Sequence, residues 1–338
     1  MTAGGSGPPP VDESAAPLLE VEGLTVRFGS PDGEVRAVED VSFSVGRGES
    51  IGIVGESGSG KTVTCMSLTW LLPSPPARYV AGRITYDSHE LRRDDPAALR
   101  SVRGSQIAMV FQNARAALDP SYRIGRQLFE VLKAHGRRED AATRDFVIET
   151  LRSCNIVDPA TVLERYPHEV SGGIAQRVTI ALALITRPSV IIADEPTTAL
   201  DLLSQLEVLR LLERIRAELQ CSIILVSHDL AVVRRIADRV LIMYAGRIVE
   251  RGPTESIFRD PRHPYTRALL ASSQQRMTGG RLYELDGQPP DLANLPAGCS
   301  FSPRCPSAFE RCHVEAPGPV PFADGRDARC FLVEVGRE

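Results

Sequence analysis

The stretch Gly55-Glu56-Ser57-Gly58-Ser59-Gly60-Lys61-Thr62 decides the fold of this 338-residue chain. It follows the pattern GxxxxGK plus Ser or Thr, in which backbone N–H groups curl around phosphate oxygens and the next helix adds its positive dipole end. A short apolar run, Ser50–Val54, precedes the stretch, and a helical pattern follows it. We therefore predict a phosphate-binding loop between a buried strand and a helix. An accidental turn rich in glycine and serine is the weaker interpretation, because the lysine stands in register.

Two side chains at the end of the loop carry the chemistry that this pattern needs. Lys61 is expected to contact the β- and γ-phosphates of ATP and to act in catalysis, and the Thr62 hydroxyl is expected to ligate Mg²⁺. The other predicted ATP contacts come from the loop itself, at Gly55, Ser57, Gly58, Ser59 and Gly60. The sequence therefore predicts a site for ATP and Mg²⁺.

A second apolar run, Val190–Ala193, ends in two adjacent carboxylates, Asp194 and Glu195. In phosphoryl transfer such a pair divides the work: the first anchors Mg²⁺ and the second polarises the attacking water. A general base contributes about 10²- to 10⁴-fold in rate, so Glu195 is expected to matter more for turnover than for binding. His228 ends the next apolar run, where its imidazole is expected to reach the γ-phosphate. The plainer alternative is a capped strand end with solvated acids.

The apolar pattern around these motifs indicates an α/β protein. Leu18–Phe28 and Val35–Val45 flank a turn signal and predict an antiparallel hairpin. Ser50–Val54, Val190–Ala193 and Ser222–Val226 are each followed by a helical pattern, which predicts a parallel sheet.

Three further segments have patterns of their own. Between about residues 96 and 179 the sequence is polar and helical, which predicts an inserted helical subdomain. Residues 201–219 predict a helix that packs on the sheet through an apolar face of Leu202, Leu206, Leu209, Leu212 and Leu219. From about residue 260, proline, glycine and cysteine replace periodic patterning and indicate a second unit with little regular structure.

Composition limits the function. The formal net charge of −4 and the pI of about 6.0 argue against nucleic acid as the main partner, because such domains usually carry a basic stripe. The apolar runs are far shorter than the roughly 20 residues that span a bilayer. Met1–Pro17 lacks the features of a secretory signal and is predicted to be a disordered cytoplasmic tail. In that compartment the seven cysteines are not expected to form disulfides.

The segment Val170–Arg177 reads Val-Ser-Gly-Gly-Ile-Ala-Gln-Arg and lies between the phosphate loop and the two carboxylates. Together with the other motifs, this segment makes the chain resemble the nucleotide-binding subunits of ABC transporters. The resemblance covers almost the whole chain from Leu18. The resemblance implies an α/β fold of the ABC-type P-loop ATPases, with a RecA-like parallel sheet core, an N-terminal antiparallel β subdomain and a helical subdomain. A Cys-rich C-terminal extension is expected to follow.

The resemblance implies further roles. Gln112 matches the glutamine loop, which implies a magnesium ligand and a member of the catalytic set. Asp201 matches the aspartate loop, and Phe28 stands where the family stacks an aromatic ring on adenine. In this family two subunits form a head-to-tail dimer, in which the signature of one subunit caps the ATP on the partner's phosphate loop. The signature residues implied here are Ser171, Gly172, Gly173 and Gln176.

The last part of the chain narrows the resemblance. Arg262–Leu270, Gly298–Cys299 and Pro303–Pro306 are similar to the tail of oligopeptide and dipeptide importer ATPases, and the D-type subunit fits best. That family implies two transmembrane permease subunits, a second ATPase subunit that is a different chain, and an external substrate-binding protein. This chain would lie peripherally at the cytoplasmic face of the cell membrane. The predicted parts are a tail (1–17), a nucleotide-binding domain (18–262) and an extension (263–338).

Two single positions and one five-residue stretch depart from the family pattern. The signature begins with Val170 rather than leucine, and it carries Ile174 where many members have glutamine or methionine. Asn113–Ala117 replaces the more usual Asp-Pro-Met-Thr-Ser after the glutamine. In the family that stretch abuts the membrane subunits, so the change bears on coupling and not on ATP chemistry.

Four cysteines crowd near the C-terminus. Cys299, Cys305, Cys312 and Cys330 have the spacing C-x5-C-x6-C-x17-C, unlike the short pairs of most zinc sites. Four thiolates in a Pro-rich segment favour a metal staple, because so small a unit lacks the apolar area to fold alone. The importer resemblance implies a 4Fe–4S cluster with a structural role. Zinc and free buried thiols stay open, and His313 is a candidate fifth ligand. The remaining cysteines are expected in the core, at Cys65, Cys154 and Cys221.

Two other functions compete with a transport ATPase. Non-transport ABC ATPases of DNA repair or of ribosomes usually carry two nucleotide-binding domains or long insertions, whereas this chain has one phosphate loop and is acidic. A regulatory subunit that binds ATP without hydrolysing it would not need Lys61, Asp194, Glu195 and His228 together. The substrate stays open among dipeptides, oligopeptides, nickel and other small solutes.

Overall fold

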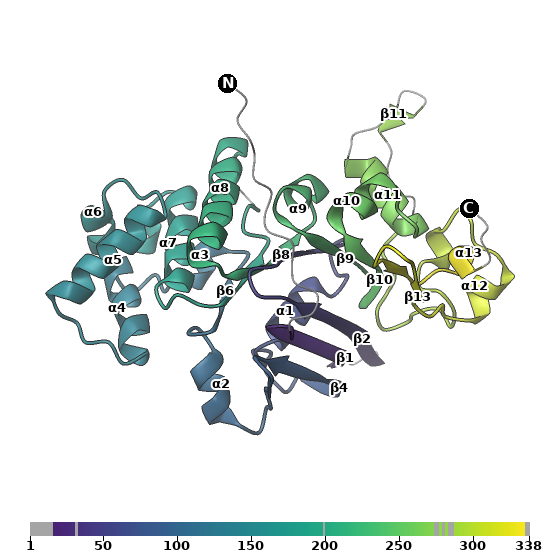
Figure 1. Cartoon of the computed structure of the whole chain (residues 1–338), viewed down its shortest axis with the longest axis horizontal. Coiled ribbons are helices and arrows are strands. Elements are labelled where there is room, and N and C mark those ends of the chain that lie inside the picture. Colours follow the sequence, from purple (N-terminus) through teal and green to yellow (C-terminus); the bar gives the residue numbers. More distant parts are fainter. Residues whose placement is uncertain are drawn as a thin grey trace.

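The computed structural model describes residues 16–30, 33–198, 200–273, 277–278, 281–282 and 287–334. The helical block from α4 (Ile124–Ala134) to α7 (Gly172–Leu184) lies at one end of the molecule, and the C-terminal segment lies at the other (Figure 1). The N-terminal sheet lies beneath the centre. The predicted tail, except for its last two residues, falls outside the described residues.

The N-terminal sheet is antiparallel and has the strand order β2-β1-β4-β5. Its register pairs Leu19 with Val45 and Phe28 with Val35, so the predicted hairpin is confirmed. The strands of this sheet are β1 (Leu19–Ser30), β2 (Gly33–Val45), β4 (Ala77–Tyr86) and β5 (His89–Glu90).

The core sheet has the strand order β13-β14-β10-β9-β3-β8-β7-β6. The five strands from β9 to β6 run parallel, as predicted, whereas β10, β14 and β13 continue the sheet antiparallel at one edge. The strands are β3 (Ser50–Val54), β6 (Ile107–Val110), β7 (Val190–Asp194), β8 (Ser222–Ser227), β9 (Arg239–Tyr244), β10 (Arg247–Pro253), β13 (Val320–Pro321) and β14 (Asp327–Ala328).

Both faces of the core sheet are apolar, because successive side chains of a strand point to opposite faces. In β8, Ile223 and Leu225 belong to the hydrophobic cluster beneath the helices. Ile224 and Val226 belong to the cluster shared with the N-terminal sheet. The continuous apolar run in the sequence therefore reflects a strand buried on both sides.

The helical region begins later than predicted. Within the predicted range 96–179, Ile107–Val110 form β6 at the edge of the core sheet, and Leu99 and Val102 of α2 pack in the cluster of the N-terminal sheet. The helices are α1 (Lys61–Ser67), α2 (Pro96–Val102), α3 (Ala114–Ala117), α4, α5 (Ala141–Ser153), α6 (Pro159–Glu164), α7, α8 (Leu202–Leu219), α9 (Leu230–Ile236), α10 (Thr254–Arg259), α11 (Pro264–Ser273), α12 (Glu310–Val314) and α13 (Phe331–Glu334).

Helix α8 exists as predicted, but its buried face differs. Leu202 is 71% exposed and Leu219 is 37% exposed, so the predicted leucine stripe is wrong at both ends. Both ends of the helix therefore lie in solvent, and its middle packs against the core. The buried residues are Val208, Leu209, Leu211, Leu212 and Ile215.

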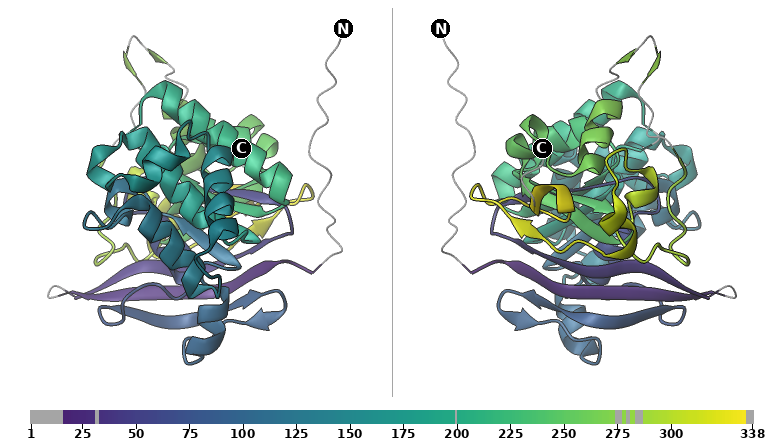
Figure 2. Two further views of the ribbon diagram at one scale, coloured as in Figure 1. Left: turned by 90° about the vertical axis from the view of Figure 1, so that its left-hand side faces the viewer. Right: turned by 90° about the vertical axis from the view of Figure 1, so that its right-hand side faces the viewer.

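The C-terminal segment, which begins near residue 260, joins the core sheet, and the predicted domain boundary at residue 263 stays a prediction. Strand β14 pairs with β10 and so extends the core sheet. Glu250 of β10 is fully buried and accepts hydrogen bonds from the backbone N–H groups of Arg262 (2.8 Å) and His263 (2.9 Å). Figure 2 shows this segment lying against the core.

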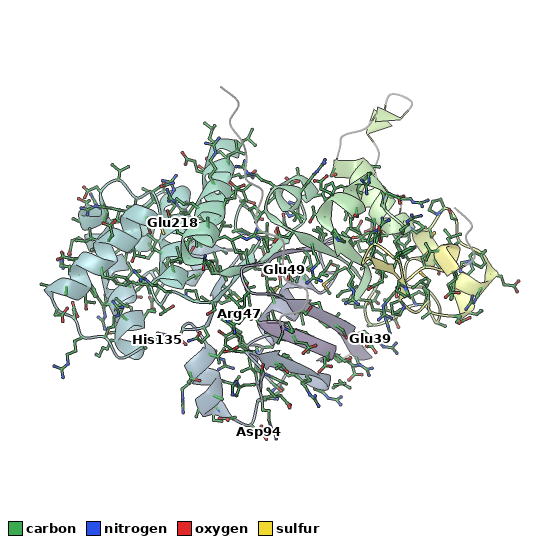
Figure 3. The ribbon with its side chains drawn as sticks, in the orientation of Figure 1. Glu39, Arg47, Glu49, Asp94, His135 and Glu218 are labelled. Carbon is green, nitrogen blue, oxygen red and sulfur yellow. The ribbon has the colours of Figure 1, made fainter. Side chains whose placement is uncertain are left out.

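The distribution of charged and apolar side chains is that of an ordinary globular protein. Charged side chains such as Asp94 and Glu218 lie at the periphery, and His135 is exposed to solvent (Figure 3). In the part of the chain that the structure describes, no helix is long and apolar enough to span a membrane. The three cysteines expected in the core are buried there, at Cys65, Cys154 and Cys221.

Candidate functional site

The phosphate loop joins β3 to α1 as predicted, and its glycines are required by geometry. Gly58 and Gly60 have φ values of 78° and 101°, which L side chains rarely adopt. A Cβ at Gly55 would lie 2.2 Å from the carbonyl oxygen of Met243, and one at Gly60 would lie 2.4 Å from that of Ala37. The loop therefore fits tightly against its neighbours, with a backbone shape that only glycine allows at these positions.

Lys61 begins α1 and is 5% exposed. Its Nζ donates hydrogen bonds to the carbonyl oxygens of Gly55 (2.8 Å) and Glu56 (2.9 Å), so the side chain folds over the loop. Burial lowers the pKa of Lys61, and the negative charges of Glu195 and Asp194 oppose that shift. A buried cation above a loop of N–H donors is suited to a polyphosphate.

Asp194 ends β7 directly beside the loop helix. It is 2% exposed, and its Oδ1 is buried without a hydrogen-bond partner. Burial raises the pKa of Asp194, while a hydrogen bond from Thr62 lowers it. The Thr62 hydroxyl and the unpaired Oδ1 of Asp194 together are suited to bind a divalent cation. Among the described residues no group of three or more His, Cys, Asp or Glu side chains is arranged to hold a metal ion, and Mg²⁺ usually takes its other ligands from water and phosphate.

Glu195 follows Asp194 and sits at the centre of a polar cluster. Its Oε2 accepts hydrogen bonds from Gln112 Nε2 (3.0 Å) and Thr198 Oγ1 (2.8 Å), and it lies 3.3 Å from His228 Nδ1. Its φ of 45° turns the chain so that the side chain leaves the strand end. Gln112 follows β6, Glu195 follows β7 and His228 follows β8, so three neighbouring parallel strands deliver these groups to one edge.

Phe28 lies in β1, where it pairs with Val35 and with Ala77 of β4. Its ring is half-buried and packs against the cluster of the N-terminal sheet. The ring is fixed at the end of a long hairpin, and its role at adenine stays a prediction.

The signature segment forms a second hollow, of about 730 Å³, away from the phosphate loop. Ser171 caps α7 by accepting a hydrogen bond from the N–H of Ile174 (3.3 Å). Asp201 caps α8 by accepting from the N–H groups of Leu203 (3.1 Å) and Ser204 (3.0 Å). The hollow is lined by Ser171, Gly172, Gly173, Ile174, Arg177, Leu200, Asp201 and Ser204.

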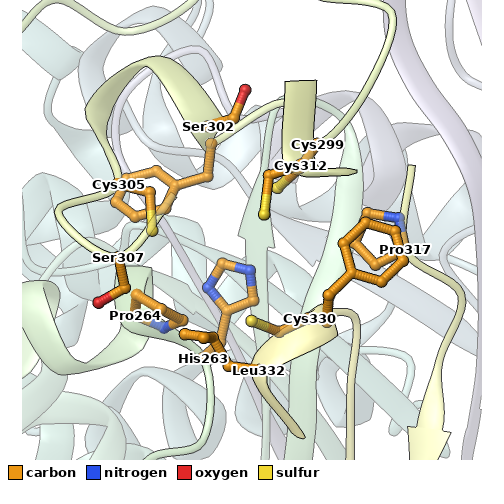
Figure 4. A pocket seen from close by; sticks show the side chains of 12 residues that line it. His263, Pro264, Cys299, Ser302, Cys305, Ser307, Cys312, Pro317, Cys330 and Leu332 are labelled. Atoms are coloured by element: carbon orange, nitrogen blue, oxygen red, sulfur yellow. The ribbon is translucent and has the colours of Figure 1, made fainter. Parts of the chain in front are cut away.

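The four C-terminal cysteines line one small cavity. We call Cys299, Cys305, Cys312 and Cys330 the cysteine cage; Figure 4 shows their thiols directed toward a shared space. Burial raises the pKa of Cys299, Cys305 and Cys330. His263 also lines this cavity; it is fully buried, its Nδ1 accepts a hydrogen bond from the N–H of Tyr265 (3.0 Å), and burial lowers its pKa to about 3.

Comparisons with known proteins agree with this geometry. A family model described as ABC transporter matches residues 38–198, and one described as oligopeptide/dipeptide transporter, C-terminal region, matches residues 249–312. The dipeptide transport ATP-binding protein DppD of Bacillus subtilis is 43% identical over 322 residues, which cover 95% of this chain and 96% of that protein. The chain belongs to the ABC transporter ATP-binding subunits.

Further matches are consistent with this family. The oligopeptide transport ATP-binding protein OppD of Salmonella typhimurium is 42% identical to this ABC subunit over 315 residues, 93% of each chain. The solved structure of cbiO1 from Clostridium perfringens, described as part of the ABC transporter complex cbiONQ, superposes with a TM-score of 0.60. It is 28% identical and covers 72% of this chain and 91% of its own. This ABC subunit therefore binds and hydrolyses ATP with Mg²⁺.

The structure of the ABC subunit bears on two further sequence predictions. Gln176, expected beside the partner's ATP, is 2% exposed within α7 and does not line the signature hollow; its role at the partner's ATP stays a prediction. Ile174 and Arg177 line the hollow instead. His313 was a candidate fifth ligand of the cage, but its side chain is exposed and lies outside the cavity; His263 lines it.

Sequence reasoning missed Thr198 as a partner of Glu195. Its hydroxyl donates to the same oxygen that Gln112 contacts. The only signal in the sequence is its position three residues after Glu195, which is ordinary for a turn. This contact holds the carboxylate of the ABC subunit in place without a charge.

Proposed function

We propose that this ABC subunit hydrolyses ATP to power the import of dipeptides or oligopeptides through a membrane permease. The relatives named as dipeptide and oligopeptide transport ATP-binding proteins match along almost the whole chain, which supports the substrate class. The observation that carries the ATPase part is the Glu195 carboxylate, held by Gln112 and Thr198 directly after Asp194.

Each group near the phosphate loop has a proposed role. Lys61 contacts the β- and γ-phosphates, and Thr62, Asp194 and Gln112 bind Mg²⁺ directly or through water. The Glu195 carboxylate accepts a proton from the attacking water as the water approaches the γ-phosphorus. His228 stabilises the γ-phosphate and, from 3.3 Å, the orientation of Glu195.

The working unit is proposed to be a dimer of ATPase subunits. The signature hollow shares no residue with the phosphate loop or with the Glu195 cluster. This separation supports two half-sites on one chain, as a head-to-tail arrangement requires. In that arrangement Ser171, Gly172 and Gly173 cap the ATP of the second ATPase subunit, a different chain, and Asp201 lies at the dimer interface.

We further propose that two transmembrane permease subunits bind next to α3, at the cytoplasmic face of the membrane, and that an external binding protein delivers the peptide. Phe111 (40% exposed) and Tyr122 (41% exposed) flank α3. Arg115 Nη2 donates to the carbonyl oxygen of Val170 (3.4 Å), which links α3 to the start of the signature. Asn113 retains a helix cap there by accepting from the N–H of Ala116 (3.1 Å).

The cysteine cage is proposed to hold a 4Fe–4S cluster. A cluster of several irons needs thiolates that surround a volume rather than converge on one atom, and the four thiols of the cage line one shared cavity. The cluster would supply structural cross-links between the ends of the C-terminal segment. Iron and sulfide analysis of anaerobically purified protein, with visible absorption, tests this proposal; zinc or no metal would contradict it.

Transport in proteoliposomes tests the proposed substrate. The complete importer, reconstituted with this subunit, should accumulate labelled dipeptides or longer peptides in an ATP-dependent manner. Uptake of Ni²⁺ with no uptake of peptides would overturn the peptide assignment. The matched control is the same complex with Lys61→Ala, which should transport neither.

A further inference from the structure

Glu56, the second residue of the phosphate loop, is held on three sides. Its carbonyl oxygen accepts from Lys61 Nζ (2.9 Å), and its N–H donates to the hydroxyl of Tyr265 (2.9 Å). Its carboxylate forms a two-pronged ion pair with Arg304, at 2.7 and 3.0 Å. Tyr265 and Arg304 both belong to the C-terminal segment, more than 200 residues away in sequence.

These contacts are buried and rigid. The Arg304 side chain is 6% exposed, that of Glu56 is 23% exposed and Tyr265 is fully buried. Tyr265 packs with Tyr244 and Phe301 at ring-centre distances of 4.6 and 5.4 Å. A two-pronged guanidinium–carboxylate pair also fixes the relative orientation of its partners. The beginning of the phosphate loop is therefore clamped by residues outside the nucleotide-binding motifs.

The charge of Glu56 makes this clamp relevant to ATP. The loop binds a triphosphate, and a carboxylate within the loop would repel the phosphates, because the two negative charges would be poorly screened from each other. Arg304 places a positive charge directly on that carboxylate. Removal of one member of such a partly buried pair leaves the other charge without its compensation.

We propose that Arg304 is a positioning residue of the ATP site: it neutralises Glu56 and, together with Tyr265, fixes the start of the phosphate loop. This inference rests on ATP binding by the subunit and not on the identity of the transported substrate. It also gives the C-terminal segment a direct part in nucleotide binding. Arg304 immediately precedes Cys305, so the clamp and the cysteine cage share one short stretch of chain.

ATP binding to the purified full-length chain tests the proposal, with Mg²⁺ present and hydrolysis negligible. Arg304→Gln should weaken ATP affinity roughly tenfold or more, because it exposes the phosphates to an uncompensated carboxylate. Adenosine, which has no phosphate, should bind equally to both forms. Adding Glu56→Gln to Arg304→Gln should restore most of the lost affinity, since the repelling charge is then gone.

Arg311→Gln is the matched control. Arg311 precedes another cage cysteine, Cys312, but it pairs with Glu315 (2.7 Å) and Glu334 (2.8 Å), away from the loop. Its replacement should leave ATP affinity unchanged. Unchanged ATP affinity in Arg304→Gln would overturn the proposal, and so would a double variant as weak as the single one.

The single variant Glu56→Gln distinguishes an electrostatic effect of Arg304 from a folding defect in the Arg304→Gln variant. This variant keeps Arg304 and removes the negative charge, while the amide oxygen of the new side chain can still accept a hydrogen bond from Arg304 and the Tyr265 contact to the backbone N–H remains. Its ATP affinity should therefore equal or exceed that of the wild type. A clear loss of affinity there contradicts the electrostatic role of Arg304 even if Arg304→Gln fails to fold. A wild-type chain that does not bind ATP at all would refute the nucleotide function itself.

Discussion

The phosphate loop and the cysteine cage are built in opposite ways. The loop is one continuous stretch, and its shape follows from Gly58, Gly60 and the junction of β3 with α1. The cage gathers thiols from positions scattered between Cys299 and Cys330, and the tertiary fold brings them to one cavity. A contiguous motif reveals both its residues and its geometry in the sequence, whereas a scattered set reveals only its residues.

The comparison also shows that the two regions are not independent. Glu56 of the loop is paired with Arg304, the neighbour of Cys305. The core sheet continues from the strand before the loop, through β9 and β10, into β14 of the C-terminal segment. Substitutions in the loop are therefore expected to impair catalysis, and substitutions in the cage are expected to lower stability. The Glu56–Arg304 pair connects the two regions.

The largest effect is expected beside the loop. Glu195→Gln keeps the size of the side chain but removes the charge that accepts a proton from water. Hydrolysis by the assembled transporter should fall by about 10²- to 10⁴-fold, while ATP binding stays unchanged. Phosphate release and nucleotide titration measure the two properties separately.

A surface carboxylate serves as the control for this substitution. Glu255 pairs with Arg234 on the surface, and its side chain is 72% exposed. Glu255→Gln should hydrolyse ATP at the wild-type rate. Undiminished turnover in Glu195→Gln would show that another group accepts the proton.

The next effect is expected at the cage. On the proposal that the cage holds an iron–sulfur cluster, replacing Cys305 and Cys312 together by serine should abolish iron binding. It should also lower the free energy of unfolding by about 3 kcal/mol or more, because loss of a metal site is among the costly changes. Anaerobic urea denaturation with iron analysis measures both quantities. An unfolding midpoint equal to that of the wild type would mean that the cage contributes no cross-link.

A smaller, pH-dependent effect is expected where the C-terminal segment joins the sheet. Burial raises the pKa of Glu250 above its ordinary value of 4.5. The folded chain then binds this proton more tightly than the unfolded chain, so the free energy of unfolding should fall as pH rises above 4.5. Glu250→Gln should flatten this dependence and cost about 1 kcal/mol at low pH.

Urea denaturation across a pH series measures the slope for Glu250. Both proteins should be compared in the same buffers, since other carboxyl groups titrate in the same range. Identical slopes in the wild type and in Glu250→Gln would assign the pH dependence to those other groups.

The smallest effect is expected for a buried cysteine outside the cage. Cys221 is 1% exposed in the core, and burial raises its pKa to about 11. Cys221→Ala should cost about 1 kcal/mol and leave iron content unchanged. A loss of iron in this variant would mean that the metal is not confined to the cage.

Much of the fold could be predicted from the sequence because the strands are short, apolar and bounded by clear signals. Ser50–Val54 and Leu18–Phe28 are examples whose structure follows the pattern closely. The strand β6, Ile107–Val110, was missed because four apolar residues at a sheet edge resemble a piece of helix. Likewise, the C-terminal segment looked separate because the two short strands that join it to the core sheet, β13 and β14, carry no alternating pattern.

Some residues of the candidate site could also be predicted from the sequence, and others could not. Lys61, Thr62, Asp194 and Glu195 follow from local motifs, and Gln112 could be assigned only through resemblance to a family. The pairing of Glu56 with Arg304 spans 248 positions, and no local pattern encodes such a distance. Contacts of this kind depend on how the whole sheet closes and become visible only in the folded chain.

The most direct measurement of the central claim is ATP hydrolysis by the complete transporter with and without peptide-loaded binding protein. Because this chain is the hydrolysing subunit of a peptide importer, we expect peptide-loaded binding protein to raise the rate of ATP hydrolysis. Lys61→Ala should abolish this increase. A rate that is unaffected by the loaded binding protein, or that survives in Lys61→Ala, would contradict the account.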